Sequence, residues 1–120
     1  MINSLKIILA SQSPRRKELI EKLGFPFEVR KFDFDESYSK DINRYDVPVY
    51  LALQKSKSVT ELKENELLLT ADTVVILNNN ILGKPTSIDE AKSMLSQLSN
   101  NTHDVVTGVC IKNNKKSESF

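Results

Sequence analysis

The sequence has few of the residues that mark several common classes of protein. Its 120 residues include one cysteine, Cys110, and one histidine, His103. A single cysteine excludes an internal disulfide framework and a cysteine metal cluster, and it fits the reducing cytoplasm, where we expect the protein. Because the chain has no second histidine, we interpret His103 as structural rather than as a metal ligand. Cys110 falls in an apolar strand pattern, so we expect it in the core.

Long apolar runs and an excess of one charge are also absent. No stretch approaches the ~20 apolar residues that span a bilayer, and the N-terminus lacks the apolar core of a signal peptide. The formal net charge is +1, which provides no extended field for nucleic acid. We therefore expect no membrane or nucleic-acid partner, and any anionic ligand must be held by a local cluster. The length fits a single domain over residues 1–120.

Strand and helix patterns alternate early in the chain, and strands dominate later. This order predicts an α/β domain with a mixed sheet. The apolar patterns predict strands over 6–9, 27–32, 67–77, 81–82 and 103–111, and helices over 14–23, 48–63 and 88–98. The helical positions expected to face the core are Leu19, Ile20 and Leu23, then Val49, Ala52, Leu53, Val59 and Leu62, and then Ile88, Ala91, Met94, Leu95 and Leu98.

One stretch near the N-terminus, between the first strand and the first helix, carries an unusual charge pattern. Ser13 is a good N-cap, and Pro14 falls at the first helical position, where its missing N–H costs nothing. Arg15 and Arg16 then occupy the positive end of the helix, where each cation costs about 0.3–1 kcal/mol. A bound anion would make this arrangement favourable, because it would offset the repulsion between the arginines and the helix end. Free N–H groups, the hydroxyls of Ser11 and Ser13, and two guanidinium groups would then form a phosphate-binding site. The alternative is that both arginines point into water.

An aspartate interrupts the most hydrophobic strand of the chain. Asp72 lies within the run Leu67–Leu77, and a carboxylate is almost never buried without a partner, because its desolvation is costly. We therefore expect a cation, a lysine or a metal beside Asp72. A functional role and a structural ion pair both remain open, and the functional role is favoured.

Three further groups of charged residues have two interpretations each. The carboxylates of Asp33, Asp35 and Glu36 form either a solvated turn or a place for a hard cation such as Mg²⁺. Lys55 falls in the second predicted helix, where a solvated side chain is the default. Gly83 followed by Lys84 combines close backbone approach with a mobile cation, a combination that also occurs by chance.

The order of these motifs resembles that of the Maf family of nucleoside triphosphate pyrophosphatases. The resemblance runs from about residue 6 to the last residue. Its motifs, in order, are Leu9–Arg16, Asp35-Glu36, Leu51-Ala52 with Lys55, Ala71–Val75, Leu82–Pro85, Ala91 with Met94-Leu95, and His103 with Val105, Thr107 and Gly108. Their joint occurrence in one order is far more specific than any motif alone.

The resemblance implies an elongated mixed sheet flanked by helices, as in the ITPase-like folds, and a cleft between two lobes. It implies hydrolysis of a nucleoside triphosphate to the monophosphate and pyrophosphate with a divalent cation, Mg²⁺ or Mn²⁺. The forms Pro-Arg-Arg and Ala-Asp-Thr resemble the branch that acts on dTTP and UTP. The implied roles are catalytic base and metal ligand for Asp72, metal ligand for Glu36, phosphate ligands for Lys55 and Lys84, triphosphate ligands for Ser11, Ser13, Arg15 and Arg16, and specificity positions for Arg15 and Thr73.

The chain departs from the family pattern in its length, because members of the family continue well past residue 120 with more strands. It is therefore expected to be a fragment, a truncated product, or a chain that needs a partner to complete its sheet, and a homodimer is one such arrangement. Two other functions stay open: a nucleotide-binding or cell-division regulatory module with weak catalysis, and a structural fragment without a ligand.

Overall fold

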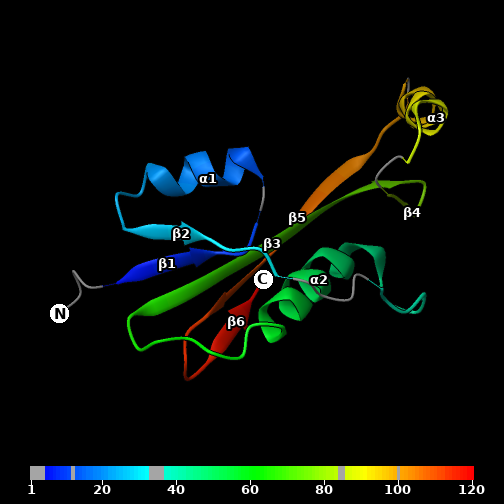
Figure 1. Ribbon diagram of the computed structural model, residues 1–120. Helices are drawn as coiled ribbons and strands as arrows, with labels where there is room; N and C mark the ends of the chain where they lie inside the picture. Colours follow the sequence, from blue (N-terminus) through cyan, green and yellow to red (C-terminus); the bar gives the residue numbers. More distant parts are fainter. Residues whose placement is uncertain (1–4, 12, 33–36, 84–85, 100) are drawn as a thin grey trace.

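The computed structural model describes residues 5–11, 13–32, 37–83, 86–99 and 101–120. It confirms the predicted α/β class, with six strands in one mixed sheet and three α-helices (Figure 1). The sheet order is β2-β1-β3-β5-β6, and β4 pairs with β3 off this path. The strands are β1 (Lys6–Leu9), β2 (Phe27–Val29), β3 (Glu66–Leu77), β4 (Asn80–Leu82), β5 (Asp104–Lys112) and β6 (Ser117–Ser119).

The long strand β3 connects the parallel and antiparallel parts of the sheet. Its first residues pair in parallel with β1, which in turn pairs in parallel with β2. Along its other edge, β3 pairs antiparallel with β5 from Leu68 to Ile76. The predicted hairpin at the end of β3 is confirmed, because Asn78 and Asn79 adopt positive φ values of 50° and 64° and lead into β4. Two central residues with positive φ match the right-handed twist of a two-residue hairpin.

The helix α1 (Pro14–Glu21) crosses from β1 to β2 and covers one face of the sheet (Figure 1). Its predicted cap is confirmed, because the Ser13 side chain accepts a hydrogen bond from the Arg16 N–H. The predicted core face is only partly right. Ile20 packs with Ile7 and Leu9, but Leu19 and Leu23 are 56% and 59% exposed. Leu23 lies beyond the end of α1, which stops at Glu21 rather than at Leu23 as predicted.

The helix α2 (Val47–Lys57) covers the opposite face, and a 3-10 turn, η2 (Arg44–Asp46), precedes it. The prediction that this helix continues to Lys63 is wrong. The helix ends at Lys57 because Lys112 Nζ of β5 donates to the carbonyls of Ser56 and Val59, at 3.1 and 2.7 Å. Val59 is still buried, but it reaches the core from an extended segment rather than from the helix.

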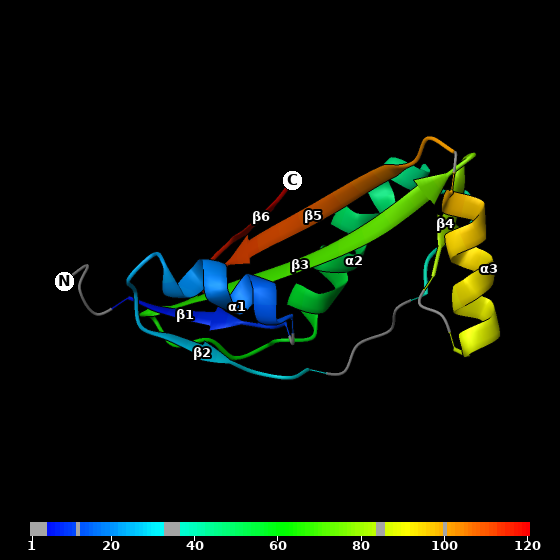
Figure 2. The same ribbon diagram turned by 90° about the horizontal axis from the view of Figure 1, so that it is seen from above.

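The helix α3 (Ile88–Leu98) stands at the far end of the ribbon formed by β3 and β5 (Figure 2). Its predicted start is confirmed, since the Ser87 hydroxyl accepts from the Glu90 N–H at 3.1 Å. Its predicted apolar face is not buried: no residue of α3 is buried within the described chain, and Ile88 and Leu95 are 75% and 67% exposed. The helical period was right, but no other described element packs closely enough on that face to bury it.

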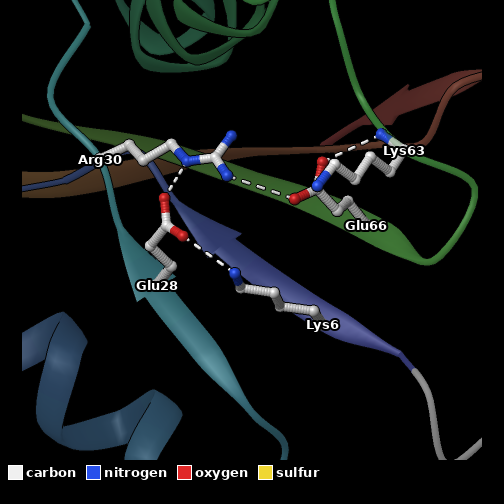
Figure 3. Close-up of polar contacts among 5 residues, drawn as sticks. All are labelled: Lys6, Glu28, Arg30, Lys63 and Glu66. Carbon is white, nitrogen blue, oxygen red and sulfur yellow. Dashed lines mark hydrogen bonds and ion pairs between the residues drawn. The ribbon is translucent and has the colours of Figure 1, made fainter.

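A chain of ion pairs ties the three parallel strands together near the start of β3 (Figure 3). Lys6 Nζ of β1 lies 2.9 Å from a carboxylate oxygen of Glu28 in β2, and Glu28 also pairs with Arg30. Arg30 Nη2 then reaches Glu66 Oε2 of β3 at 3.3 Å. Glu66 is 4% exposed, and its other oxygen accepts from the Lys63 N–H at 2.9 Å. The strand predicted over 27–32 is shorter in the structure: β2 ends at Val29, opposite Leu9, the last residue of its partner β1.

Two smaller expectations are also settled. Cys110 is a free cysteine that is fully buried in β5, as predicted. The last predicted strand is confirmed with a shift of one residue, and His103 lies just before it, exposed to solvent. Within the described residues, every helix is too short or too polar to cross a bilayer.

Candidate functional site

The candidate site begins in the loop between β1 and α1. Ser11 is 8% exposed, and its Oγ accepts a hydrogen bond from the Ser13 N–H at 3.2 Å. The Ser13 Oγ accepts from the Arg16 N–H at 3.5 Å, so the two serines organise the loop and the first helical turn. Both hydroxyls lie at the positive end of α1, beyond the carboxyl end of β1. In open α/β sheets, ligands bind beyond the carboxyl ends of parallel strands.

The guanidinium of Arg16 is held by three acceptors. Its Nη1 donates to Ser11 Oγ at 3.4 Å and to the Ala71 carbonyl at 3.3 Å, and its Nη2 donates to Thr73 Oγ1 at 2.8 Å. Within the described chain its Nε has no acceptor, and no carboxylate lies within ion-pair distance. Arginine has five N–H donors in a fixed planar geometry. A guanidinium fixed in this way keeps its charge and its remaining donors available for an anion.

The Ala71 carbonyl is available because of the way the strands pair. Val109 exchanges both backbone hydrogen bonds with Phe120, at 2.8 and 2.9 Å. The N–H and C=O of Val109 therefore point toward β6 and away from β3. Its partner Ala71 forms no hydrogen bond with it, so the N–H and C=O of Ala71 point toward the other edge of β3, away from β5. Along that edge, β1 ends near Leu69 and the pairing with β4 begins only at Val75. Among the described residues, no strand pairs with the segment between these two strands, so this stretch of backbone is open.

A second cation reaches the same carbonyl from the other side of the sheet. Lys55 Nζ, on α2, donates to the Ala71 oxygen at 3.0 Å. Lys55 is half-buried rather than on a solvated helix face, which was the default expectation from the sequence. Arg16 and Lys55 therefore bring two cationic groups to one carbonyl at the edge of β3.

Asp72 lies directly beside this point. It is half-buried, and its Oδ1 accepts a hydrogen bond from the N–H of Thr73 at 2.9 Å. The expectation of a cationic partner is not met among the described residues, where no lysine or arginine pairs with Asp72. Partial exposure explains this, because a carboxylate in contact with water does not need an ion pair to offset its desolvation. Its Oδ2 has no hydrogen bond within the described chain.

The structure brings together six of the sequence-predicted site residues and separates or omits the others. Those that meet at the open edge of β3 are Ser11, Ser13, Arg16, Lys55, Asp72 and Thr73. Arg15 is exposed in the first turn of α1 and makes no hydrogen bond within the described chain. Glu36 and Lys84 lie outside the described residues, as do Asp33 and Asp35. In the part that is described, no three acidic, histidine or cysteine side chains gather as a metal site.

Sequence reasoning assigned no role to two groups that the structure places here. The first is the backbone carbonyl of Ala71, which only the strand pairing exposes. The second is Thr107 of β5, whose Oγ1 lies 2.8 Å from Thr73 Oγ1. The alternation of Val105, Thr107 and Val109 on a strand could have shown that Thr107 shares a face with them, but not which residue it meets.

A separate pocket of about 560 Å³ lies near the start of β3, and Arg30, Lys63, Glu66 and Lys112 line part of it. None of the residues gathered at the open edge of β3 lines this pocket. Two of its basic groups are already bound within the chain: Arg30 pairs with Glu28 and Glu66, and Lys112 caps α2. The pocket therefore belongs to the structural ion-pair network rather than to the candidate site.

Comparison with known proteins agrees with the resemblance seen in the motifs. The family model described as "Maf-like protein" matches residues 6–120. The dTTP/UTP pyrophosphatase of Flavobacterium psychrophilum is 46% identical over 114 residues, which are 94% of this chain and 58% of that protein. That of Porphyromonas gingivalis is 45% identical over 123 residues, covering 99% and 62%. The chain thus spans about three fifths of the length of these curated relatives.

The fold has a relative among solved structures. The Ham1 protein of Staphylococcus aureus superposes with a TM-score of 0.59 at 18% identity, over 96% of this chain and 67% of that one. This likeness supports the mixed sheet with flanking helices, which the sequence predicted. The family itself rests on the model match and on the relatives above 40% identity. The chain belongs to the Maf family.

Proposed function

We propose that this chain binds a nucleoside triphosphate, dTTP or UTP, at the open edge of β3 and hydrolyses it to the monophosphate and pyrophosphate. One observation carries the proposal: Arg16 and Lys55, from helices on opposite faces of the sheet, converge on the Ala71 carbonyl beside Asp72. The names of the relatives, dTTP/UTP pyrophosphatase, supply the substrate class. The convergence matches the needs of that substrate, because a polyphosphate concentrates negative charge that cations and amide N–H groups stabilise.

The polyphosphate is expected to lie over the positive end of α1. There Ser13 caps the first turn, the Arg15 N–H has no acceptor within the described chain, and Arg16 keeps donors that no described residue uses. A planar guanidinium binds two phosphate oxygens at once, whereas the Lys55 ammonium acts as a point charge. Together they would stabilise charge that moves onto the leaving pyrophosphate as its bond to the α-phosphorus breaks.

Asp72 is the proposed general base. Water attacks the α-phosphorus, the bond from that phosphorus to the bridging oxygen breaks, and the water proton passes to the free Oδ2 of Asp72. The hydrogen bond from the Thr73 N–H to Oδ1 fixes the orientation of the carboxylate. Partial exposure leaves room for the attacking water beside it.

A divalent cation is part of the proposal. The donor set fits Mg²⁺ or Mn²⁺ in kind, because Asp72 Oδ1 accepts one hydrogen bond and keeps a second lone pair for a cation. Mg²⁺ is often bound by one or two carboxylates plus substrate phosphates. When bound, the cation would supply charge neutralisation at the phosphates. Glu36 is the second carboxylate expected from the sequence, and Lys84 a further phosphate ligand. We place the activity in the cytoplasm, which the lone free Cys110 supports.

The test compares Asp72→Asn with Asp41→Asn, a matched change at an exposed loop carboxylate. The 120-residue chain is incubated with UTP and Mg²⁺, and nucleotide products and pyrophosphate are quantified. We expect UMP and pyrophosphate, a loss of at least ~10²-fold in turnover for Asp72→Asn, and no loss for Asp41→Asn. Release of UDP and phosphate instead, or full activity of Asp72→Asn, would contradict the proposal.

Binding is measured separately with α,β-imido-UTP, which cannot be cleaved between the α- and β-phosphorus. Binding without turnover would favour the alternative of a nucleotide-binding module. Sedimentation of the same samples tests the expected homodimer.

A further inference from the structure

Thr107 lies at the back of the candidate site, on the face of the sheet that α1 covers. It is paired directly with Thr73 across β3 and β5, and the two hydroxyl oxygens are 2.8 Å apart. Both residues are exposed, so this contact is not a consequence of core packing. Thr73 in turn accepts a hydrogen bond of 2.8 Å from Arg16 Nη2. Three side chains from three elements therefore form one continuous series of hydrogen bonds.

The chemistry of the groups fixes part of this series. A guanidinium can only donate, so Thr73 must accept from Arg16. A hydroxyl has one proton and two lone pairs, so the bond to Thr107 uses either the proton or the second lone pair of Thr73. In both cases Thr107 stops the Thr73 hydroxyl from turning away from Arg16. Without the Thr107 hydroxyl, Thr73 would satisfy its proton with water and rotate among its rotamers.

The bond to Thr73 is the shortest of the three that hold Arg16, since those to Ser11 and Ala71 measure 3.4 and 3.3 Å. Within the described residues Nη2 makes no other hydrogen bond, so the bond to Thr73 helps set the rotation of the guanidinium plane. The Nε–H, which has no acceptor within the described chain, is thereby held on the edge left for a ligand. Holding such a group in its bound orientation lowers the entropy lost on binding.

We propose that Thr107 is a positioning residue of the nucleotide site: through Thr73 it holds the Arg16 guanidinium in the orientation that binds the polyphosphate. The inference rests on the proposed function, which supplies the ligand. Thr107 touches neither the ligand nor the reacting atoms, and it acts through Arg16 alone.

The experiment is a double-mutant cycle measured by titration calorimetry with α,β-imido-UTP and Mg²⁺. We expect Thr107→Val, which removes the hydroxyl and keeps the shape, to weaken binding by about 3–10-fold, as for one neutral hydrogen bond. Thr107→Ser restores the hydroxyl and should bind within about twofold of the wild type. Thr102→Val, at an exposed threonine just before β5, is the matched control and should bind as the wild type does.

The decisive comparison is in the Arg16→Ala background, where Thr107→Val should have no further effect on binding. Two results would overturn the positioning role and leave the proposed function standing. In the first, Thr107→Val weakens binding by the same factor in the Arg16→Ala background as in the wild type. In the second, Thr107→Val binds as the wild type does although Arg16→Ala binds more weakly. Failure of the wild-type chain to bind the analogue would instead overturn the proposed function and this inference with it. The side-chain NMR signal of Arg16 Nε gives a ligand-free readout, which Thr107→Val should shift and Thr107→Ser should leave in place.

Discussion

Gly108 of β5 lies directly against the backbone of Val49 in the first turn of α2. A Cβ added at Gly108 would lie 2.2 Å from the Val49 amide nitrogen and 2.4 Å from Val49 Cα. Gly108 is also the cross-strand partner of Asp72. The absence of a side chain at this position therefore lets the start of α2 approach the sheet at the level of the proposed general base.

The first prediction follows from this contact. Gly108→Ala should destabilise the fold by about 2 kcal/mol or more, because backbone atoms cannot yield as the end of a flexible side chain can. Gly83→Ala is the control, since an added Cβ there meets nothing within 4 Å. Urea denaturation of both variants measures the difference. Equal free energies of unfolding for the two variants would mean that the backbone of α2 does not pack directly against Gly108.

The second prediction separates the two arginines of α1. Arg16→Ala should weaken binding of α,β-imido-UTP by about 1.5–3 kcal/mol, the range for a hydrogen bond to a charged group. Arg15→Ala should cost less, because Arg15 is exposed and makes no hydrogen bond within the described chain. The sequence assigned both residues to the triphosphate, and that assignment stays a prediction. Equal losses for the two variants would support it and contradict the larger role expected for Arg16.

The third prediction concerns the end of α2. Lys112→Met keeps the aliphatic stem but removes the ammonium that caps the carbonyls of Ser56 and Val59. We expect a loss of about 1–2 kcal/mol in the free energy of unfolding, from the charged hydrogen bonds and the helix dipole. Lys115→Met, at an exposed lysine of the adjacent turn, should leave stability unchanged. A similar loss in both variants would mean that charge in general, rather than the cap, is responsible.

The fourth prediction is a pH dependence of stability. The hydrogen bond from Arg30, and next that from Lys6, lower the pKa of Glu28 from 4.5 to about 2. Because the folded pKa is lowered, the stabilisation is present above the unfolded value near 4.5 and is lost as the pH falls toward 2. Urea midpoints of wild type and Glu28→Gln should therefore differ above pH 5 and converge by about pH 2. A difference that stays constant over this range would contradict the assignment.

How far the sequence predicts the fold can be judged from particular elements. The apolar run around Val74, the asparagine turn at its end and the cap at Ser87 were predicted correctly, because each depends on residues close together in the chain. The predicted end of α2 was wrong because the observed end depends on Lys112, which is distant in sequence. The predicted burial of Leu19 and Leu23 was wrong because apolar periodicity identifies an apolar face but does not show whether another element covers it.

The candidate site divides in the same way. Arg16 and Asp72 could be found from the sequence because each carries a charge that its position disfavours. Arg16 lies at the positive end of a helix, and Asp72 lies in an apolar strand. The Ala71 carbonyl could not be found, because every residue has a carbonyl. This one lacks a strand partner within the described chain because β1 ends opposite Leu69. Thr107 could not be assigned because its role depends on the register between β3 and β5.

The fully buried thiol of Cys110 gives the molecule a built-in reporter. It sits where β3, β5 and β6 run side by side, opposite Thr70 on one strand and Ser119 on the other. A thiol reagent can reach this sulfur only when the packing around it opens, so the rate of labelling under native conditions measures how often this part of the core opens. Since Cys110 is the only cysteine of the chain, that rate can be read without removing any other residue.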